Sequence, residues 1–283
     1  MTEKQEKSNV KHFRRYRIGD YARYMGVGTA FLKHYEKFGI ITAQHEENGY
    51  RYFGFEKSSL IIECMRLGNL GFTVREMEAM LHERTGDDAV AALREARTAL
   101  EAKIRRMEAF VEEEKRFEAW YAARRETPED WRVVESEARW FLPHADGSQF
   151  LEDERIQALL PAWLEWLPVV KSSLRFVVPE APSEHLDYQW GLSVDAAKAE
   201  AFGLPVNDVI VRLPPAKVFE YHFAGPGQME VLRRLAQRTH PLYGVLDSLG
   251  FRPVGAGVMD LFMTADRRGA REGFGVFRIP VAR

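Results

Sequence analysis

The sequence has a single cysteine, no proline before residue 128 and no long apolar run. The one thiol, Cys64, excludes an internal disulfide framework and any multi-thiolate metal site. No stretch approaches the roughly 18 uninterrupted apolar residues of a membrane span, and the polar residues 1–10 contain no apolar core of a signal peptide. We therefore expect a cytoplasmic protein that has no membrane segment.

An excess of one charge is missing from the whole chain but present in its parts. The 283 residues include 40 Lys and Arg and 42 Asp and Glu, which gives a net charge of −2. Residues 1–60 nevertheless carry +4, residues 61–130 carry −4 and residues 131–283 carry −2. Five basic residues of the first segment lie close together: Lys11, Arg14, Arg15, Arg17 and Arg23. Such a cluster suits a phosphate-facing surface, although a solvated basic tail has the same composition.

A long helix is predicted in the middle of the chain. Residues 87–126 contain neither Pro nor Gly and are rich in strong helix formers, and Thr127-Pro128 ends them. Apolar residues at alternating spacings of three and four form a seam that Arg97 interrupts: Val90, Leu93, Leu100, Ile104, Met107 and Val111. A helix of this length extends about 60 Å. A partner helix covers such a seam more economically than the helix's own domain, so we expect a dimer.

The segment before this helix shows a helix-turn-helix pattern. Residues 16–25 are typical of a short helix, Gly26-Val27-Gly28 of a tight turn, and residues 30–38, capped by Thr29, of a second helix. Asn48-Gly49, followed by Tyr50-Arg51-Tyr52-Phe53, predicts a hairpin, which after a recognition helix would be a wing.

A second helical pair is predicted over residues 55–67 and 73–81, the latter opened by a capping box of Thr73 and Glu76. Four phrases, in their order and spacing, resemble the MerR family of transcriptional regulators: Tyr16-Arg17-Ile18-Gly19-Asp20, His34-Tyr35-Glu36-Lys37-Phe38-Gly39-Ile40, Asn48-Gly49-Tyr50-Arg51-Tyr52 and Leu70-Gly71-Phe72-Thr73-Val74-Arg75-Glu76-Met77. Lys33-His34 stands where the family usually has Arg-Tyr. Lysine meets a phosphate as a point charge without the guanidinium fork.

The resemblance implies that two protomers join through antiparallel long helices and bind a near-palindromic promoter operator of double-stranded DNA. Binding energy would offset the distortion of the operator so that RNA polymerase can engage the promoter. The residues implied to contact DNA are Arg17, Arg23, Thr29, Ala30, Lys33, His34, Tyr35, Arg51 and Tyr52. Each could instead have a packing or surface role, above all the aromatic residues Tyr35 and Tyr52.

The carboxy-terminal segment, residues 131–283, contains a weak internal repeat of strand, helix, strand and strand. The expected elements of the first half are 131–142, 152–170, 173–178 and 185–194, and those of the second half are 208–223, 228–249, 255–264 and 273–281. Leu213-Pro214-Pro215-Ala216-Lys217-Val218-Phe219-Glu220-Tyr221, Gly225-Pro226 and Ile279-Pro280-Val281 resemble the GyrI-like (gyrase-inhibitory-protein-like) effector domain.

The GyrI-like resemblance implies a pocket for a small organic effector that is lipophilic and either cationic or aromatic. In multidrug-sensing relatives a carboxylate on the pocket floor pairs with lipophilic cations, and Asp260 matches that position, with Glu220 as a second candidate. The aromatic residues that could wall the pocket, or form ordinary core, are Trp140, Trp163, Trp166, Tyr188, Trp190, Tyr221, Tyr243 and Phe262.

The expected fold class is therefore α+β and multidomain, with an all-α winged helix-turn-helix head, a long antiparallel coiled-coil helix and a duplicated βαββ effector domain. The predicted segments are an N-terminal tail at 1–15, the DNA-binding domain at 16–84, the dimerisation helix at 87–127 and the ligand-binding domain at 131–283.

Metal sensing is not expected, because metal-sensing relatives depend on cysteines that this chain lacks. We expect no cofactor and no enzymatic activity, since the sequence contains no Gly-x-Ser-x-Gly elbow, phosphate loop or zinc signature. Two alternatives stay open for the carboxy-terminal segment. It could be a small-molecule hydrolase that uses Asp260 or Glu220, or a haem or porphyrin binder with His222 and His240 as ligands.

Overall fold

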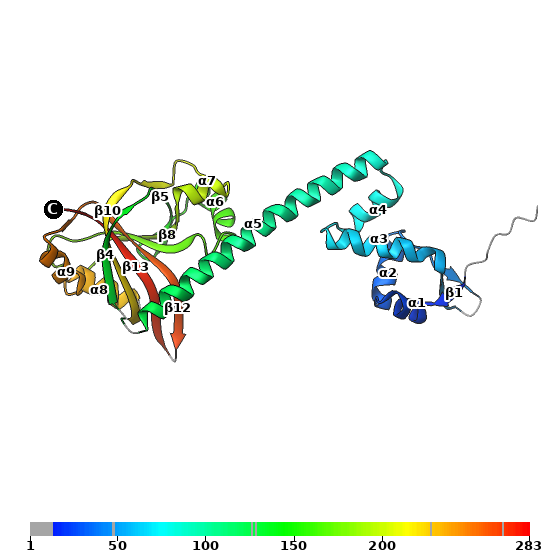
Figure 1. Cartoon of the computed structure of the whole chain (residues 1–283), viewed down its shortest axis with the longest axis horizontal. Helices are drawn as coiled ribbons and strands as arrows, with labels where there is room; N and C mark the ends of the chain where they lie inside the picture. Colours follow the sequence, from blue (N-terminus) through cyan, green and yellow to red (C-terminus); the bar gives the residue numbers. More distant parts are fainter. Residues whose placement is uncertain (1–13, 47–48, 126, 128, 227, 268) are drawn as a thin grey trace, which may run out of the picture. The chain divides into compact units, whose positions relative to one another are not determined.

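The computed structural model (Figure 1) describes residues 14–46, 49–125, 127, 129–226, 228–267 and 269–283. Expectations that involve Lys11 and residues 1–13 of the tail, Asn48 of the hairpin, or Glu126 and Pro128 at the end of the long helix lie outside these residues. The chain divides into two compact units, Met1–Arg105 and Arg106–Arg283. The long helix is therefore shared between the two units.

The amino-terminal unit combines short helices with a small sheet. Its helices are α1 (Ile18–Met25), α2 (Thr29–Lys37), the 3-10 helix η1 (Phe55–Lys57), α3 (Ser58–Asn69), α4 (Val74–His82) and the first half of α5 (Gly86–Arg124). A three-stranded antiparallel sheet has the order β1-β3-β2, with bounds Arg15–Arg17, Arg51–Gly54 and Gln44–His45. The expected hairpin is thus formed by β2 and β3, and the head is not purely helical.

Two local predictions in this unit need correction, and one is confirmed. Tyr16 and Arg17 belong to strand β1 and not to the first helix, because they pair with Phe53 and Tyr52 of β3. Gly28, not Thr29, is the N-cap of α2, and Thr29 is the first helical residue. The capping box of α4 is present: the Thr73 N–H donates to the Glu76 carboxylate at 2.7 Å, and the Glu76 N–H donates to the Thr73 hydroxyl at 3.4 Å.

The core of the amino-terminal unit fixes the orientation of α2. Leu32 and Tyr35 lie on its inner side, 0% and 6% exposed, and pack with residues of α1, α3, α4 and β3. Cys64 lies in the same core, and burial raises the pKa of its thiol to about 11. The thiol is therefore a buried apolar group that does not ionise near neutral pH.

The carboxy-terminal unit is built on one large antiparallel sheet. Its central order is β4-β10-β13-β12-β7-β8-β5-β6, while β9 pairs with β5 and β11 with β13. The strands are β4 (Glu129–Ser136), β5 (Arg139–Asp146), β6 (Gln149–Phe150), β7 (Lys171–Val177), β8 (Tyr188–Asp195), β9 (Val211–Leu213), β10 (Ala216–Pro226), β11 (Arg252–Pro253), β12 (Ala256–Arg267) and β13 (Ala270–Ala282). The helices are α6 (Glu154–Leu164), α7 (Ala196–Ala201), α8 (Gln228–Ala236) and α9 (Leu242–Leu249), beside the second half of α5.

Several predicted elements of this unit are divided in the structure. The strand expected over 131–142 is two strands, β4 and β5, which lie on opposite sides of the sheet centre. The strand expected over 208–223 is likewise β9 and β10, and the helix expected over 228–249 is α8 and α9. The helix expected over 152–170 ends at Leu164, and α7 was not expected. The two halves occupy the sheet as β5-β8-β7 and β10-β13-β12, joined where β7 pairs with β12.

The two faces of the second half of the sheet differ because side chains alternate along each strand. Met259 of β12, Phe277 of β13 and Phe219 of β10 point to one face, where they form an apolar core with residues of α8 and α9. The intervening residues Asp260 and Arg278 point to the other face, where they line a cavity together with residues of α5. The alternation of the strands thus turns these charged side chains toward α5. Figure 1 shows the second half of α5 crossing the sheet near β12.

Candidate DNA-binding surface and candidate ligand cavity

One face of α2 is exposed and basic. Leu32 and Tyr35 are buried, so the opposite side of α2 faces solvent. The residues of that side recur at intervals of three and four along the helix. The exposed residues of this face are Thr29, Ala30, Lys33, His34 and Lys37. No ion pair involves Lys33 or Lys37 among the described residues, so both ammonium groups are available for an anionic partner. We call these five residues the α2 face.

Basic residues of α1 and the small sheet have partners of their own. Arg17 donates through Nε to the Tyr52 hydroxyl at 3.3 Å and lies over the Tyr50 ring at 4.5 Å. Arg23 forms an exposed ion pair with Asp20 at 3.1 Å. These side chains remain exposed, and their pairs are worth little in water.

Arg51 starts β3 and pairs with an acidic residue of α2. Its Nε lies 3.1 Å from Glu36 Oε2, and its side chain is 42% exposed. The ion pair ties the hairpin to the side of α2 that carries Glu36.

The structure brings together four of the nine residues expected to contact DNA: Thr29, Ala30, Lys33 and His34 lie on the α2 face. Arg17, Arg23, Arg51 and Tyr52 lie outside it, on α1 and the small sheet. Tyr35 is the exception, since it lies in the core and its hydroxyl donates to Met77 Sδ at 3.5 Å. Lys37, which the sequence reading did not single out, belongs to the α2 face and follows from the same helical spacing.

Residues 16–84 match the family model of the MerR HTH family regulatory protein. The match covers both helices of the turn, the hairpin and the helical pair α3–α4. We refer to residues 16–84 as the MerR-type head, after the family model that they match.

One characterised relative matches a stretch of 76 residues of the chain. It is the mercuric resistance operon regulatory protein of Bacillus cereus, 30% identical over 76 residues, which are 26% of this chain and 58% of that protein. The chain thus spans little more than half the length of this relative.

Solved structures match over longer or similar stretches with low TM-scores. The chain in the cryo-EM structure of the EcmrR–DNA complex is 16% identical, and the match covers 95% of this chain and all of that one with a TM-score of 0.36. The EcmrR C-terminal domain is 10% identical over 55% of this chain and 98% of its own, with a TM-score of 0.35. The N-terminus of MtaN, the Bacillus subtilis multidrug transporter activator, is 23% identical over 36% of this chain and 96% of its own, with a TM-score of 0.32.

A cavity of about 310 Å³ lies within the carboxy-terminal unit, between the second half of α5 and the charged face of the sheet. We call it the α5 cavity. Its lining residues are Glu113, Arg116, Phe117, Trp120, Arg132, Arg139, Val169, Lys171, Val194, Asp195, Lys198, His222, Asp260, Phe262 and Arg278. Of the residues expected to bind a ligand, Asp260 and Phe262 are therefore on its wall.

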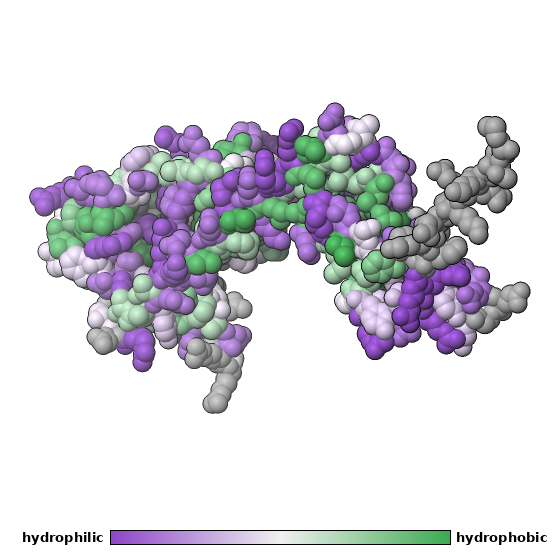
Figure 2. Space-filling view, turned by 45° about the vertical axis from the view of Figure 1, so that its right-hand side comes forward, coloured by the Kyte–Doolittle hydropathy of each residue, from purple (hydrophilic) through white to green (hydrophobic). Residues whose placement is uncertain are grey.

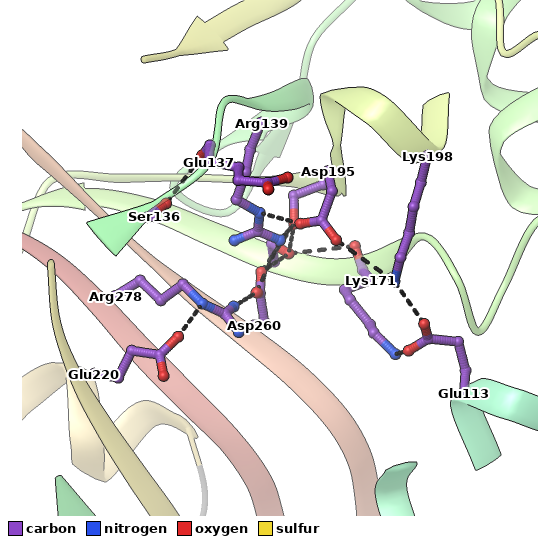
Figure 3. Close-up of polar contacts among 12 residues, drawn as sticks. Glu113, Ser136, Glu137, Arg139, Lys171, Asp195, Lys198, Glu220, Asp260 and Arg278 are labelled. Atoms are coloured by element: carbon purple, nitrogen blue, oxygen red, sulfur yellow. Dashed lines mark hydrogen bonds and ion pairs between the residues drawn. The ribbon is translucent and has the colours of Figure 1, made fainter. Parts of the chain in front are cut away.

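Asp260 is 1% exposed, and donors surround both of its oxygens (Figure 3). Oδ1 accepts from the hydroxyls of Ser173 and Ser193 at 2.7 and 2.8 Å. Oδ2 pairs with Arg139 Nη2 at 2.9 Å and with Arg278 Nη1. Burial alone would raise the pKa of Asp260, but the two guanidinium charges and the two hydroxyl donors hold it well below its usual range.

Glu220 stands behind the wall and binds two residues that line the cavity. Its oxygens accept from Arg132 Nε at 2.6 Å and from Arg278 Nε at 2.9 Å. Burial acts to raise the pKa of Glu220, yet the charges of these two arginines lower it overall. Arg278 thus bridges Glu220 and Asp260, the two candidate carboxylates.

Glu113 attaches α5 to the sheet. Its carboxylate lies 2.6 Å from Lys198 Nζ and 3.0 Å from Lys171 Nζ, and Arg116 binds it from the next turn of α5 at 2.7 Å. The side chain is 8% exposed. Burial opposes ionisation, but the lysine partners lower the pKa of Glu113 below its ordinary value.

Aromatic residues form the remaining wall of the α5 cavity. Phe262 of β12 lies against Trp120 and Phe117 of α5, with ring centroids 5.1 and 6.5 Å apart. The Trp120 indole donates to His222 Nδ1 at 2.9 Å. Burial and the nearby Arg124 lower the pKa of His222 to about 4, so its imidazole is neutral near pH 7.

The other aromatic residues expected in the pocket lie elsewhere. Trp140 and Trp163 belong to the core around α6, and Trp166 stacks on Phe202 beside it. Tyr188, Tyr221 and Tyr243 belong to the core under α8 and α9. These six aromatic residues thus belong to two apolar cores and do not line the α5 cavity.

Trp190 lines a second, more apolar cavity of about 540 Å³. We call it the α6 cavity, because Ile156, Leu160 and Leu164 of α6 form much of its wall. The Trp190 indole donates to Ser172 at 3.0 Å, and the ring is 41% exposed.

The sequence reading missed Arg139, Arg278, Lys171 and Lys198 on the wall of the α5 cavity. Arg139 and Arg278 interrupt apolar strand sequences, as Asp260 does, and a charged group in such a strand needs a buried partner. Phe117 of α5 is a further lining residue that the sequence does not single out. Nothing in its spacing indicates that it faces Phe262, which is 145 positions further along the chain.

The two histidines of the haem alternative lie in different surroundings. His222 faces the α5 cavity, whereas His240 packs against the rings of Tyr221 and Phe277 in the opposite core and accepts the Leu242 N–H at 3.3 Å. Within the described ranges no cluster of three or more His, Cys, Asp or Glu could hold a metal ion. None of the helices in that part of the chain is long and apolar enough to cross a membrane.

Proposed function

We propose that this protein is a ligand-responsive transcriptional regulator that binds a near-palindromic promoter operator as a homodimer and distorts it so that RNA polymerase can engage. The observation that carries the proposal is the exposed, basic α2 face on a head that matches the MerR family. Lys33 and Lys37 would meet phosphates, while Thr29, Ala30 and His34 lie where base edges would be read.

Basic residues around the α2 face would extend the contact to the DNA backbone. Arg17 and Arg23 are exposed, and Arg51 and Tyr52 lie on the hairpin that would serve as the wing. Tyr35 would act indirectly in this proposal, because its ring fixes α2 in the core and does not reach the surface.

A second copy of the chain would cover the exposed seam of α5. Val90, Ile104, Met107 and Val111 are between 42% and 55% exposed, although they are large and apolar. Figure 2 shows apolar patches at the surface among hydrophilic residues. Leu93 instead packs against the core of the MerR-type head, and Leu100 is half-buried. An antiparallel helix pair is the arrangement that the proposal assigns to this seam.

The effector-binding part would be the carboxy-terminal unit, a GyrI-like domain in this proposal. Its two halves repeat the same strand order about the β7–β12 pair, and the α5 cavity combines buried polar groups with aromatic rings, as small-molecule sites do. Asp260 would contribute to this site by holding the guanidinium groups of Arg139 and Arg278 in position. Effector binding would shift the populations of DNA-bound states through α5, which contributes Glu113, Phe117 and Trp120 to the wall.

Selection from a random pool of double-stranded DNA tests the proposal. The full chain should enrich one near-palindromic sequence, and footprinting of the selected duplex should show protection of two half-sites. The double variant Lys33→Ala/Lys37→Ala should enrich nothing, whereas Lys217→Ala, an exposed lysine of the carboxy-terminal unit, should select the same sequence as the wild type. The absence of any enriched sequence with the wild-type chain would overturn the proposed function.

A further inference from the structure

The α5 cavity has an excess of positive charge. Six cationic side chains line it, namely Arg116, Arg132, Arg139, Lys171, Lys198 and Arg278, whereas the carboxylates on its wall are Glu113, Asp195 and Asp260. Glu220, which binds two of the arginines from behind, still leaves an excess of two positive charges. A cavity with low-dielectric walls and one excess sign of charge favours occupants of the opposite sign.

Two of the three carboxylates on the cavity wall, Asp260 and Glu113, already bind several cationic partners. A carboxylate offers about four acceptor positions. Asp260 uses them on two guanidinium groups and two hydroxyls, and Glu113 uses three on Arg116, Lys171 and Lys198. A cationic molecule that binds Asp260 or Glu113 would have to displace an arginine or lysine and leave its charge without a partner.

A donor, in contrast, is left without a partner. Arg139 Nη1 is buried and makes no hydrogen bond with any of the described residues, although Nη2 of the same guanidinium binds Asp260 and Ser193. The Arg139 side chain is 8% exposed and lines the cavity. An unpaired buried donor of a charged group is expensive, so an acceptor supplied by a ligand would relieve this cost.

The aromatic residues of the wall set the shape of the occupant. Phe262, Trp120 and Phe117 line the cavity and lie against one another, and Lys171 Nζ lies 5.5 Å from the centre of the Phe262 ring. The volume of about 310 Å³ is at the lower end of the range for small-molecule sites. A planar aromatic body of one or two rings that carries one anionic group fits both walls.

We propose that the effector of the α5 cavity is an aromatic organic anion, a carboxylate or sulfonate whose oxygens bind Arg139 and whose ring packs on Phe262 and Trp120. The inference rests on the proposed effector role of the carboxy-terminal unit. The proposed ligand is thus an anion, whereas the resemblance to multidrug-sensing proteins implies a lipophilic cation. The neighbouring lysines, Lys171 and Lys198, add to the attraction but are already bound to Glu113.

Three probes that share a naphthalene ring test the charge of the ligand on the full chain. 2-Naphthoate is anionic, 2-naphthamide is its neutral isostere, and (2-naphthylmethyl)trimethylammonium is cationic. Isothermal titration calorimetry at low salt should show 2-naphthoate binding at least tenfold more tightly than either of the others, and this advantage should shrink as salt is added. Equal affinities, or a preference for the ammonium probe, would overturn the anionic class and leave the proposed DNA-binding function, which the selection experiment tests separately.

The Arg139→Lys variant tests the residue. Lysine keeps the positive charge beside Asp260 but lacks the guanidinium fork that carries the free donor. The affinity for 2-naphthoate should fall at least tenfold, and that for 2-naphthamide less than threefold. A purely structural role would lower both affinities by the same factor. The melting temperature of each variant, followed by tryptophan fluorescence, verifies that it is folded.

The Trp190→Leu variant is the matched control. It removes an aromatic ring from the wall of the α6 cavity and leaves the α5 cavity intact. The affinity for 2-naphthoate should not change in this variant, whereas Phe262→Leu should lower it. Loss of binding in Trp190→Leu, or no binding of any probe to the wild-type chain, would contradict the assignment of the anion to the α5 cavity.

Discussion

At the scale of single residues, the lone acid Asp260 determines how the carboxy-terminal unit is organised. Its charge compensates two guanidinium groups that come from β5 and β13. Removing one partner of a buried ion pair is costly, because the remaining charge stays buried. The two buried arginines need the negative charge of Asp260, and the Asp260 carboxylate needs their positive charges.

We predict that Asp260→Asn lowers the unfolding free energy of the carboxy-terminal unit by about 3 kcal/mol at pH 7. All six tryptophans of the chain lie between residues 120 and 190, so tryptophan fluorescence in a urea titration reports on this unit. Asp208→Asn is the matched control, since that carboxylate is 73% exposed and should change stability by no more than about 0.5 kcal/mol. An equal loss of unfolding free energy in both variants would contradict the role of Asp260 in compensating the two arginines.

The pH dependence of this loss follows from the lowered pKa of Asp260. A group whose pKa is depressed by folding stabilises the fold above its unfolded pKa, about 3.9 for Asp, and loses this effect as the pH falls toward the folded value. The difference between the wild type and Asp260→Asn should therefore be the same at pH 7 and pH 5 and narrow only in stronger acid. A difference that halves between pH 7 and pH 5 would contradict the burial and pairing of Asp260.

His222 gives a second prediction at this scale. Its Nδ1 accepts from Trp120, so the neutral ring must carry its proton on Nε2, and its folded pKa is about 4. Its stabilising effect is present above the unfolded pKa of about 6.5 and is lost as the pH falls toward 4. Long-range ¹H–¹⁵N spectra, assigned with a His222→Gln variant, should show the Nε2–H tautomer unchanged between pH 7 and pH 5. A titration midpoint of the His222 imidazole near pH 6.5 would contradict the lowered pKa.

At the scale of elements, the long helix α5 was the most predictable part of the fold. A run of 39 helical residues without an internal Pro or Gly leaves no competing structure, and the predicted limits differ from Gly86–Arg124 by one residue at the start and two at the end. The three-residue strand β1 was not predictable, because three residues are too few to show an alternation. Its pairing with β3 depends on residues 35 to 39 positions further along the chain.

The exposed seam of α5 gives the prediction at this scale. Ile104 is 55% exposed, so Ile104→Glu should leave the fold of each protomer unchanged while placing two charges in the interface of the proposed homodimer. Sedimentation velocity at micromolar concentration should show a dimer for the wild type and a monomer for this variant. Lys103→Glu, on a neighbouring exposed position, should stay dimeric. A wild-type monomer would exclude the seam as a dimer interface.

At the scale of the whole molecule, the sequence predicted the MerR-type head better than the ligand cavity. The head is recognised from phrases of adjacent residues, so its helices, its hairpin and its inward and outward faces follow from local spacing. The α5 cavity is assembled from α5, β4, β5, β7, β8, α7, β10, β12 and β13, and the register between distant strands decides which side chains meet. Aromatic composition predicted burial, but could not indicate which rings share a cavity.

The charge of the cavity illustrates the same limit. Asp260 is a lone carboxylate in an apolar strand, it is buried, and such a group needs a partner. Its partner Arg139 is 121 positions away in the chain, and Arg278 is on the neighbouring strand. Without these partners an acid on a pocket floor suggests a cationic ligand, and with them the same residue supports an anionic one.

The salt dependence of operator binding tests the central claim, that two copies of the chain bind DNA through the α2 face. Each neutralised phosphate contributes about −0.9 to the slope of log K against log salt concentration. For the duplex obtained by selection, Lys33→Ala should weaken binding and make this slope less steep by about 2, one contact for each protomer. The control Lys217→Ala should keep the wild-type slope. Identical slopes for the wild type and Lys33→Ala would contradict the account.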